Sequence, residues 1–426
     1  MAADPPIARP QWRTRDFLLF WGGETVSALG TQVTYLALPL AAILTLHATS
    51  AWVGLVTAGT TLPVLIVTPL AGVWVDRHRS RPLMLVAHIA RAVTLAAIPL
   101  LAWAAMLTLP TLLAVALLVG GFSAAFEIAY LSYVPTLVDR DALVRANSAI
   151  EGTTSVADTL GPGLAGVLIQ LVTAPGAILF DAVSYAVAGW TVLAVRSREP
   201  AREASSATAP DAPRATVREM ARDIADGARR TLQDPILRGL IAVSASFNFF
   251  EQAVMTNFLL YTSRVLHLRA GTIGLALAAG GIGTMAGTVF CGRVGPTLRS
   301  GLALGGGMAI ASVSLALLPA VADIGLWTPI AFGAIFALYG LGLVVFNIYA
   351  VTLRQLHVPP DMLGRVNAGY RTITYGAMPL GALAGGAVGG LLGFRVTLAL
   401  AGAGLIAGAV VFLRSVAARL RGVLPA

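Results

Sequence analysis

The sequence predicts an all-α membrane protein in which twelve transmembrane helices form two six-helix bundles, each a repeat of the other in the same orientation. Two observations predict this fold. The 426 residues are 57% hydrophobic and only 12% charged, about half the charge of a typical soluble domain. The second half of the chain also repeats short motifs of the first half at a constant spacing of 220 positions.

The repeat is clearest before the fifth and eleventh predicted helices. Five residues of the first half are Val138, Asp141, Leu143, Arg145 and Asn147. The same residue types return 220 positions later as Val358, Asp361, Leu363, Arg365 and Asn367. A hydrophobic chain built from two halves of like orientation is typical of a transporter whose binding site lies between the halves.

The apolar runs set the expected helix bounds. A helix needs about 20 residues to cross the hydrocarbon core, where the backbone must satisfy its own hydrogen bonds. We expect spans at residues 17–44, 52–74, 83–104, 110–134, 147–172, 175–195, 236–262, 271–292, 298–319, 327–353, 363–391 and 395–415.

Three regions follow from these spans. Residues 1–195 form the N-terminal bundle, 196–235 a cytoplasmic linker and 236–426 the C-terminal bundle. The second part of the linker carries an apolar helical stripe, typical of an amphipathic helix on the inner leaflet. A plain solvated linker is the alternative.

The basic residues predict the orientation. All 29 are arginines, and 24 of them lie in, or within three residues of, the two termini and the even-numbered connections between spans. The positive-inside rule therefore places both termini in the cytoplasm, which for a bacterial protein means a multi-pass protein of the cytoplasmic membrane. The net charge of +9 belongs to this asymmetry and favours contact with anionic lipid headgroups of the inner leaflet, not with nucleic acid.

The chain lacks the residue clusters of an enzyme or a cofactor protein. It has a single cysteine, Cys291, and five scattered histidines, so we expect no metal and no cofactor. It contains no lysine, which excludes a phosphate-binding motif of the Walker type and ATP-driven pumping by this chain. We expect a monomer that is not an enzyme, with a small molecule and protons as its partners.

The connection between the second and third spans carries the first family motif. Gly72, Asp76, Arg77 and Arg81 match a loop motif of the major facilitator superfamily, although Ser80 stands where a basic residue is usual. In that family the motif latches the cytoplasmic side of the transporter. The resemblance implies a gating role for these residues, and for Asp141, Arg145, Asp361, Arg365 and Arg371 in and beside the repeated motif. Charge that only sets the topology is the alternative.

The fifth span carries a second motif. Gly161, Pro162 and Gly166 resemble a glycine–proline motif that marks exporters in the same family, with alanine at two of its other glycines. Small residues also allow helices to pack closely without any such role. Further stretches, such as Phe180-Asp181-Ala182-Val183-Ser184, are similar to the bacterial branch of macrolide-efflux and enterobactin-export proteins.

Acidic residues inside the spans are the candidates for proton coupling. Glu24, Glu127, Asp158 and Glu251 lie within apolar runs, where an ionisable group is costly and marks a functional site by default. Such an acid can take a proton from one side and release it to the other, or exchange it for a cationic substrate. Pairing with nearby arginines is the alternative. For Asp181 we favour a structural role.

Polar and aromatic residues near these acids are the candidates for the substrate cavity. They are Tyr35, Asn248, Phe250, Gln252, Asn347 and Tyr375. The sequence thus predicts a secondary transporter that exports small amphipathic or hydrophobic compounds by alternating access and proton antiport. A facilitator of lipids or metabolites without proton coupling is the main alternative, and a membrane receptor without transport a remote one.

Overall fold

The computed structural model describes residues 14–196, 222, 229, 232–294, 300–325, 327–359 and 362–415. These residues form twelve long helices and no strand. The first six are α1 (Arg15–Leu40), α2 (Ser50–Arg77), α3 (Ser80–Trp103), α4 (Leu109–Tyr133), α5 (Leu143–Val172) and α6 (Ala174–Ala194). The other six are α8 (Pro235–Leu260), α9 (Ala270–Val294), α10 (Ser300–Ala316), α11 (Trp327–His357), α12 (Leu363–Leu392) and α13 (Phe394–Ser415).

Eleven of these helices are long and apolar enough to cross a membrane. The twelfth, α8, has 26 residues, as α1 has. The predicted all-helical fold is confirmed, and most predicted bounds lie within four residues of the observed helices. Most of the linker, including the predicted amphipathic helix, lies outside the described residues, so that helix stays a prediction.

The structure repeats with the same period as the sequence. Helices α1 and α8 begin and end 220 positions apart, and so do α5 and α12. The first helix of each half, α1 or α8, continues into a π-helical turn, at Ala41–Thr45 and at Tyr261–Val265. His47 and His267, just after those turns, both have φ of 48°. Such an unusual backbone angle at equivalent positions indicates that the two halves are copies of one unit.

The two bundles meet along two helix pairs, α5 with α9 and α2 with α12. Gly166 of α5 lies against Gly274 of α9, where an added Cβ would lie 2.9 Å from the partner Cα. Gly54 of α2 faces Gly386 of α12 in the same way, at 3.1 Å. These pairs are related by the 220-residue repeat. Glycine is needed at all four positions because the backbones touch.

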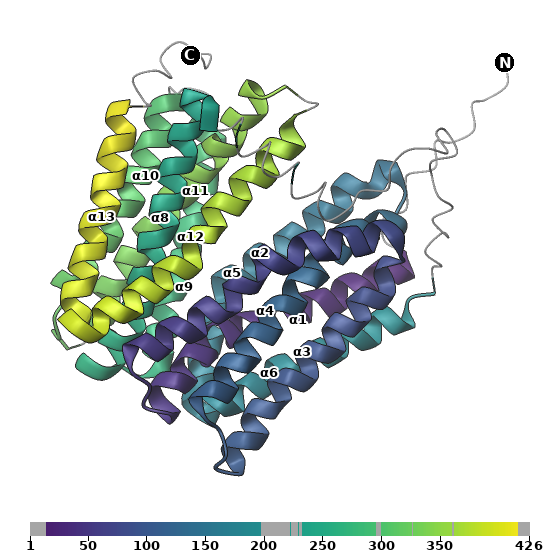
Figure 1. Ribbon diagram of the computed structural model, residues 1–426, viewed down its shortest axis with the longest axis horizontal. Helices are drawn as coiled ribbons and strands as arrows, with labels where there is room; N and C mark the ends of the chain where they lie inside the picture. The colour runs from purple at the N-terminus through teal and green to yellow at the C-terminus, as the bar shows by residue number, and fades with distance from the viewer. Residues whose placement is uncertain are drawn as a thin grey trace.

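These contacts gather at one end of the molecule, and the bundles diverge toward the other end (Figure 1). The glycine pairs lie near the starts of α2 and α9 and in the later parts of α5 and α12. Near the same end, Arg264 Nη2 donates a hydrogen bond of 2.6 Å to the Ala48 carbonyl. The start of α1 and the end of α13 lie at the opposite, divergent end, because successive helices alternate in direction.

Candidate functional site

Two of the cavities lined by described residues contain candidate residues, one at the junction of the bundles and one within the C-terminal bundle. The smaller cavity, about 190 Å³, is lined by α1, α2, α4, α6 and α8. The larger, about 580 Å³, is lined by α8, α10, α11 and α12. Together they hold most of the residues that the sequence suggested for a substrate site.

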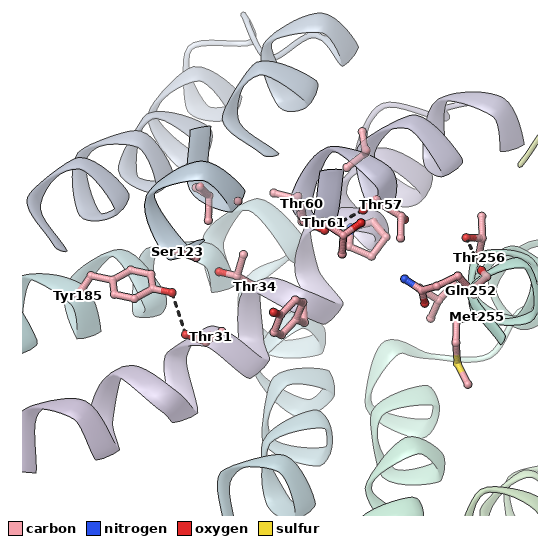
Figure 2. Close-up of a pocket in the computed structure, with 17 residues that line it drawn as sticks. Thr31, Thr34, Thr57, Thr60, Thr61, Ser123, Tyr185, Gln252, Met255 and Thr256 are labelled. Atoms are coloured by element: carbon pink, nitrogen blue, oxygen red, sulfur yellow. Dashed lines mark hydrogen bonds between the residues drawn. The ribbon is translucent and has the colours of Figure 1, made fainter. Parts of the chain in front are cut away.

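The smaller cavity is rich in hydroxyl groups, and none of the described residues that line it is charged (Figure 2). Tyr185 and Thr31 are joined by a hydrogen bond of 2.8 Å between their hydroxyls. The predicted residues Tyr35 and Gln252 both line the cavity. Tyr35 comes from the N-terminal bundle and Gln252 from the C-terminal bundle. Both halves therefore contribute to this cavity, which suits an uncharged, largely apolar group.

The larger cavity combines aromatic rings with charged side chains. The predicted residues Asn248, Glu251, Asn347 and Tyr375 line it, together with Arg371.

Phe250 lines neither of these two cavities. Its ring instead packs over Gly404 of α13, where a Cβ would lie 2.4 Å from the ring. This face of α8 therefore turns toward α13, and a place for Phe250 in the substrate cavity stays a prediction.

Glu251 accepts a hydrogen bond from a neutral group. The Tyr339 hydroxyl of α11 donates to Glu251 Oε1 at 2.6 Å. The Tyr339 ring stacks on Phe247 at 6.4 Å between centroids, which fixes the hydroxyl in place. Among the described residues, no arginine or histidine lies within 4 Å of this carboxylate. Protonation of Glu251 would therefore break no ion pair within this part of the chain.

Glu24 also has a neutral contact, through a histidine that the sequence did not single out. His88 of α3 is fully buried, and its Nε2 lies 3.0 Å from Glu24 Oε1. Arg91 donates to the other ring nitrogen, Nδ1, at 3.1 Å. Because an arginine can only donate, Nδ1 must accept, and the ring hydrogen sits on Nε2 and points at Glu24.

Arg91 extends this network toward the smaller cavity. Its guanidinium lies over the rings of Tyr185, at 4.0 Å, and Phe126, at 4.4 Å. Tyr185 lines the cavity. Contact with two aromatic faces stabilises a buried guanidinium. Arg91 is thus held inside the N-terminal bundle and does not reach the membrane surface.

Asp181 is buried and accepts hydrogen bonds from two hydroxyl groups. Thr34 of α1 donates to one carboxylate oxygen, and Ser184 donates to the other at 3.0 Å. Gly30 leaves the room for these groups, since a Cβ there would lie 2.2 Å from the Ser184 hydroxyl. Asp181 therefore ties α6 to α1.

Glu127 and Arg371 form an ion pair between the two bundles. Arg371 Nη2 of α12 lies 3.0 Å from Glu127 Oε1 of α4, and about half of each side chain is exposed. An exposed pair of this kind contributes roughly 0–1 kcal/mol. It is therefore weak enough to break during a conformational change.

Asp158 of α5 accepts a hydrogen bond from Gln32 of α1. Its side chain is exposed, but it lines neither cavity. Val156 and Leu160 form an exposed apolar face of the same helix. At about 100° per residue, Asp158 lies on roughly the opposite side from Val156, toward α1.

The residues of the predicted gate are only partly described. Gly72 is half-buried in α2, whereas the side chains of Asp76 and Arg77 and all of Asp361 lie outside what the structure describes. Asp141, Arg145 and Arg365 are exposed.

Arg81, which belongs to the same predicted gate, donates to carbonyls at the end of α6. Its acceptors are Val192, Leu193 and Val195. These hydrogen bonds satisfy the last carbonyls of a helix within the bundle of Arg81 itself.

The predicted exporter motif lies at the junction of the bundles. Gly166 makes the contact with Gly274, and the Pro162 carbonyl lies 2.3 Å from where a Cβ on Gly274 would be. Gly161 instead packs on the Gln32 side chain of α1. The motif thus lets α5 contact a helix on each side, one in each bundle.

The fold consists of two repeated six-helix bundles joined at one end, and the larger cavity is lined by an acid and several aromatic rings. These features are typical of a membrane transporter. Residues 20–379 match the family model of the Major Facilitator Superfamily. The chain therefore belongs to this superfamily and is a multi-pass membrane transporter.

Several curated relatives cover most of the chain at low identity. The enterobactin exporter EntS of Citrobacter koseri is 25% identical over 392 residues, which cover 89% of this chain and 87% of EntS. The multidrug efflux pump Tap of Mycobacterium tuberculosis is 26% identical over 389 residues, which cover 88% of both chains. An uncharacterised MFS-type transporter of Sinorhizobium fredii is 27% identical over 369 residues, 85% of this chain and 86% of the relative.

Solved structures show the same fold. A bacterial homologue of the iron transporter ferroportin, in an inward-facing state, superposes with a TM-score of 0.74 at 16% identity and covers 94% of this chain and 98% of its own. The nucleoside transporter NupG gives a TM-score of 0.74 at 13% identity and covers 94% of this chain and 99% of its own.

Proposed function

We propose that the protein exports small amphipathic or hydrophobic compounds across the bacterial cytoplasmic membrane, by alternating access and in exchange for protons. The observation that carries this proposal is Glu251. This carboxylate faces the larger cavity and is hydrogen-bonded to a neutral hydroxyl. It can gain or lose a proton, or exchange it for a substrate, without the cost of breaking a buried ion pair.

The proposed topology gives this structure a direction. With both termini in the cytoplasm, the glycine contacts of α5–α9 and α2–α12 close the outer end, and the divergent end faces the cytoplasm. Export in particular is supported by the exporter-like motif of α5 and by the likeness to EntS and Tap. If the bundles rock relative to each other during transport, the Glu127–Arg371 ion pair between them must break and form again once in each cycle.

Accumulation of fluorescent lipophiles tests both export and coupling. The chain is expressed in a bacterium that lacks its main efflux pump, and a panel of uncharged and cationic dyes is loaded with and without a protonophore. We expect lower dye accumulation in expressing cells and loss of that difference when the protonophore is added. Proteoliposomes with an imposed pH gradient then show whether the gradient alone drives the transport.

Glu251→Gln tests the proton site. It keeps the shape and the hydrogen bond to Tyr339 but removes the titrating group, so gradient-driven export should stop while exchange of substrate down its own gradient continues. Glu151→Gln is the matched control, since Glu151 is exposed and lines neither cavity. Full gradient-driven export by Glu251→Gln would remove Glu251 from the mechanism. Wild-type transport that ignores the pH gradient would mean a facilitator without coupling.

A further inference from the structure

The larger cavity contains a buried arginine whose charge is not balanced by the described residues around it. Arg354 of α11 lines this cavity and is only 9% exposed. Its Nε and Nη1 atoms have no hydrogen-bond partner in the described part of the chain, and no carboxylate there forms an ion pair with it. A guanidinium stays charged at any physiological pH, and a buried charge without a counter-charge is costly.

The position of Arg354 is fixed by packing. Its guanidinium lies 3.8 Å from the centroid of the Tyr370 ring, and the Tyr370 hydroxyl is held by Ser244 of α8 at 2.6 Å. The planar group therefore presents its N–H edge from a defined place. A fixed guanidinium of this kind is suited to bind a carboxylate or phosphate through two parallel hydrogen bonds.

A second arginine, Arg371 of α12, lines the same cavity. Its guanidinium lies 5.3 Å from the centroid of the Tyr375 ring, which is one turn further along the same helix. Arg371 also forms the ion pair with Glu127. The cavity thus has two guanidinium groups, and only one of them is already paired with a carboxylate among the described residues.

The acid of the cavity lies away from Arg354. Glu251 follows Ser244, the residue that holds the Tyr370 hydroxyl, by about two turns of α8. At a rise of about 1.5 Å per residue, this places it about 10 Å further along the helix. Glu251 and Arg354 therefore lie at different depths of the cavity, and the acid does not occupy the N–H edge of Arg354.

Apolar and aromatic side chains complete the walls of the cavity. They are Phe247, Met308, Leu343, Phe346 and Met378. A cavity of about 580 Å³ falls in the range that holds drug-sized ligands.

From this arrangement we propose that the larger cavity binds an amphipathic organic anion, with its acidic group on Arg354 and its apolar body against the aromatic walls. The proposed function is needed only to place this cavity on the transport route, and the anion site itself is argued from the residues of the cavity. Arg354 is the fixed anchor, because it has no competing carboxylate among the described residues. Arg371 lines the same cavity, but its charge is already paired with Glu127.

Binding of three matched probes tests the proposal. Each probe has the same pyrene body on a short alkyl chain that ends in a carboxylate, a hydroxyl or a trimethylammonium group. Their affinities are measured on the full chain in nanodiscs of phosphatidylcholine, which carries no net charge. We expect the carboxylate probe to bind the wild type about tenfold more tightly than the hydroxyl probe, which is about 1.4 kcal/mol.

Two variants separate the role of Arg354 from a general effect of charge. Arg354→Gln should lose the preference for the carboxylate while still binding the hydroxyl probe, which also shows that the variant is folded. Arg238→Gln removes the same charge from an exposed position near the start of α8 and should keep the preference. If Arg354→Gln does not fold, Arg354→Lys should keep the preference with a lower affinity for the carboxylate.

The outcomes distinguish this inference from the proposed function. Equal binding of all three probes by the wild type, or an undiminished carboxylate preference in Arg354→Gln, would overturn the anion site. If uncharged dyes are nevertheless exported with protons, the proposed function stands without it. If the carboxylate probe binds through Arg354 but no compound is exported, the anion site stands and the proposed function fails.

Discussion

At the scale of single residues, the membrane-embedded acids differ in what they contact. Glu127 faces an arginine, Glu24 a histidine, Glu251 a tyrosine and Asp181 two hydroxyl side chains. An acid paired with an arginine must lose an ion pair when it takes up a proton, whereas an acid bonded to a neutral group does not. This difference sets Glu127 apart from Glu24, Glu251 and Asp181, which are bonded to neutral groups.

The contact between His88 and Glu24 leads to a prediction about stability. In His88→Ala, Arg91 and Glu24 would each lose a buried partner, which we expect to destabilise the protein by about 1–3 kcal/mol. His88→Gln should lose less, because an amide can accept from Arg91 and donate to Glu24 at the same time. Thermal unfolding of the purified variants in detergent measures both effects. Equal losses in the two variants would show that ring packing, not hydrogen bonding, is what His88 contributes.

The sequence singled out the candidate acids but not the residues that they contact. Glu24 and Glu251 stand out because ionisable groups are rare in apolar runs. His88 and Tyr339 lie 64 and 88 positions away from them, and helical periodicity relates only neighbours on one helix. Arg354 was missed for another reason. It lies at the end of a span, where an arginine is expected merely to set the topology.

At the scale of helices, the start of α8 is fixed by Asp234. Its Oδ1 accepts from the backbone N–H groups of Ile236 and Leu237 at 2.8 and 2.9 Å, and its Oδ2 lies 2.9 Å from His357 Nε2 at the end of α11. Burial alone would raise the pKa of Asp234, but these hydrogen bonds outweigh it and hold the pKa below its usual value. The carboxylate form is therefore the one that stabilises this end of the bundle.

The lowered pKa gives a testable pH dependence. Because the folded pKa is below the unfolded one, the contribution of Asp234 is present above about pH 4 and is lost as the pH falls further. Asp234→Asn keeps the helix cap but not the charge, so it should be less stable than the wild type at neutral pH and equally stable in the acid range. Asp234→Ala also loses the cap, at about 1 kcal/mol. Thermal unfolding from acid to neutral pH tests this, and a difference that persists in acid would contradict it.

The close approach of α5 and α9 depends on Gly166. A Cβ at this position would lie 2.5 Å from the Ala270 carbonyl oxygen and 2.9 Å from the Gly274 Cα, so Gly166→Ala must push the helices apart. We expect transport to fall by about tenfold or more, because the state in which the two helices touch would be destabilised by about 1.4 kcal/mol. Gly152→Ala on the same helix is the control, since nothing lies within 4 Å of its added Cβ. Unchanged transport in Gly166→Ala would show that this contact need not form during the cycle.

Helix positions were predictable because their signals are local. An apolar run that must satisfy its own backbone hydrogen bonds has only one structure open to it in hydrocarbon. The early start of α5, at Leu143 and not at residue 147, shows the limit of this reasoning. Its first five residues include Arg145 and Asn147 and extend beyond the predicted apolar run. Hydropathy detects only the apolar part of a helix, so it misses a helix end that is made of polar residues.

At the scale of the whole molecule, the bundles have largely separate hydrophobic cores. One core cluster of buried residues belongs entirely to α8–α13 and their turns, and another, near Phe17 and Tyr133, belongs entirely to the N-terminal half. The main core of the N-terminal bundle also includes Leu260 and Ala270 of the other half. Bodies with largely separate cores can move relative to each other while most of each core stays buried. Besides the Glu127–Arg371 ion pair, backbone contacts at one end join the bundles, and the sequence could not reveal these contacts because each glycine pair joins positions more than 100 residues apart.

Cross-linking that end tests whether it must open. Ser50 of α2 faces Gly390 of α12, where a Cβ would lie 3.0 Å from the serine hydroxyl oxygen, close enough for a disulfide after substitution of both by cysteine. The native Cys291 is the only cysteine in the chain and is first replaced by serine. We expect the oxidised Ser50→Cys/Gly390→Cys protein to lose transport and to regain it on reduction. Because the disulfide would hold the bundles together where they now touch, transport by the fully oxidised protein at the wild-type rate would mean that substrate does not leave by the parting of this end.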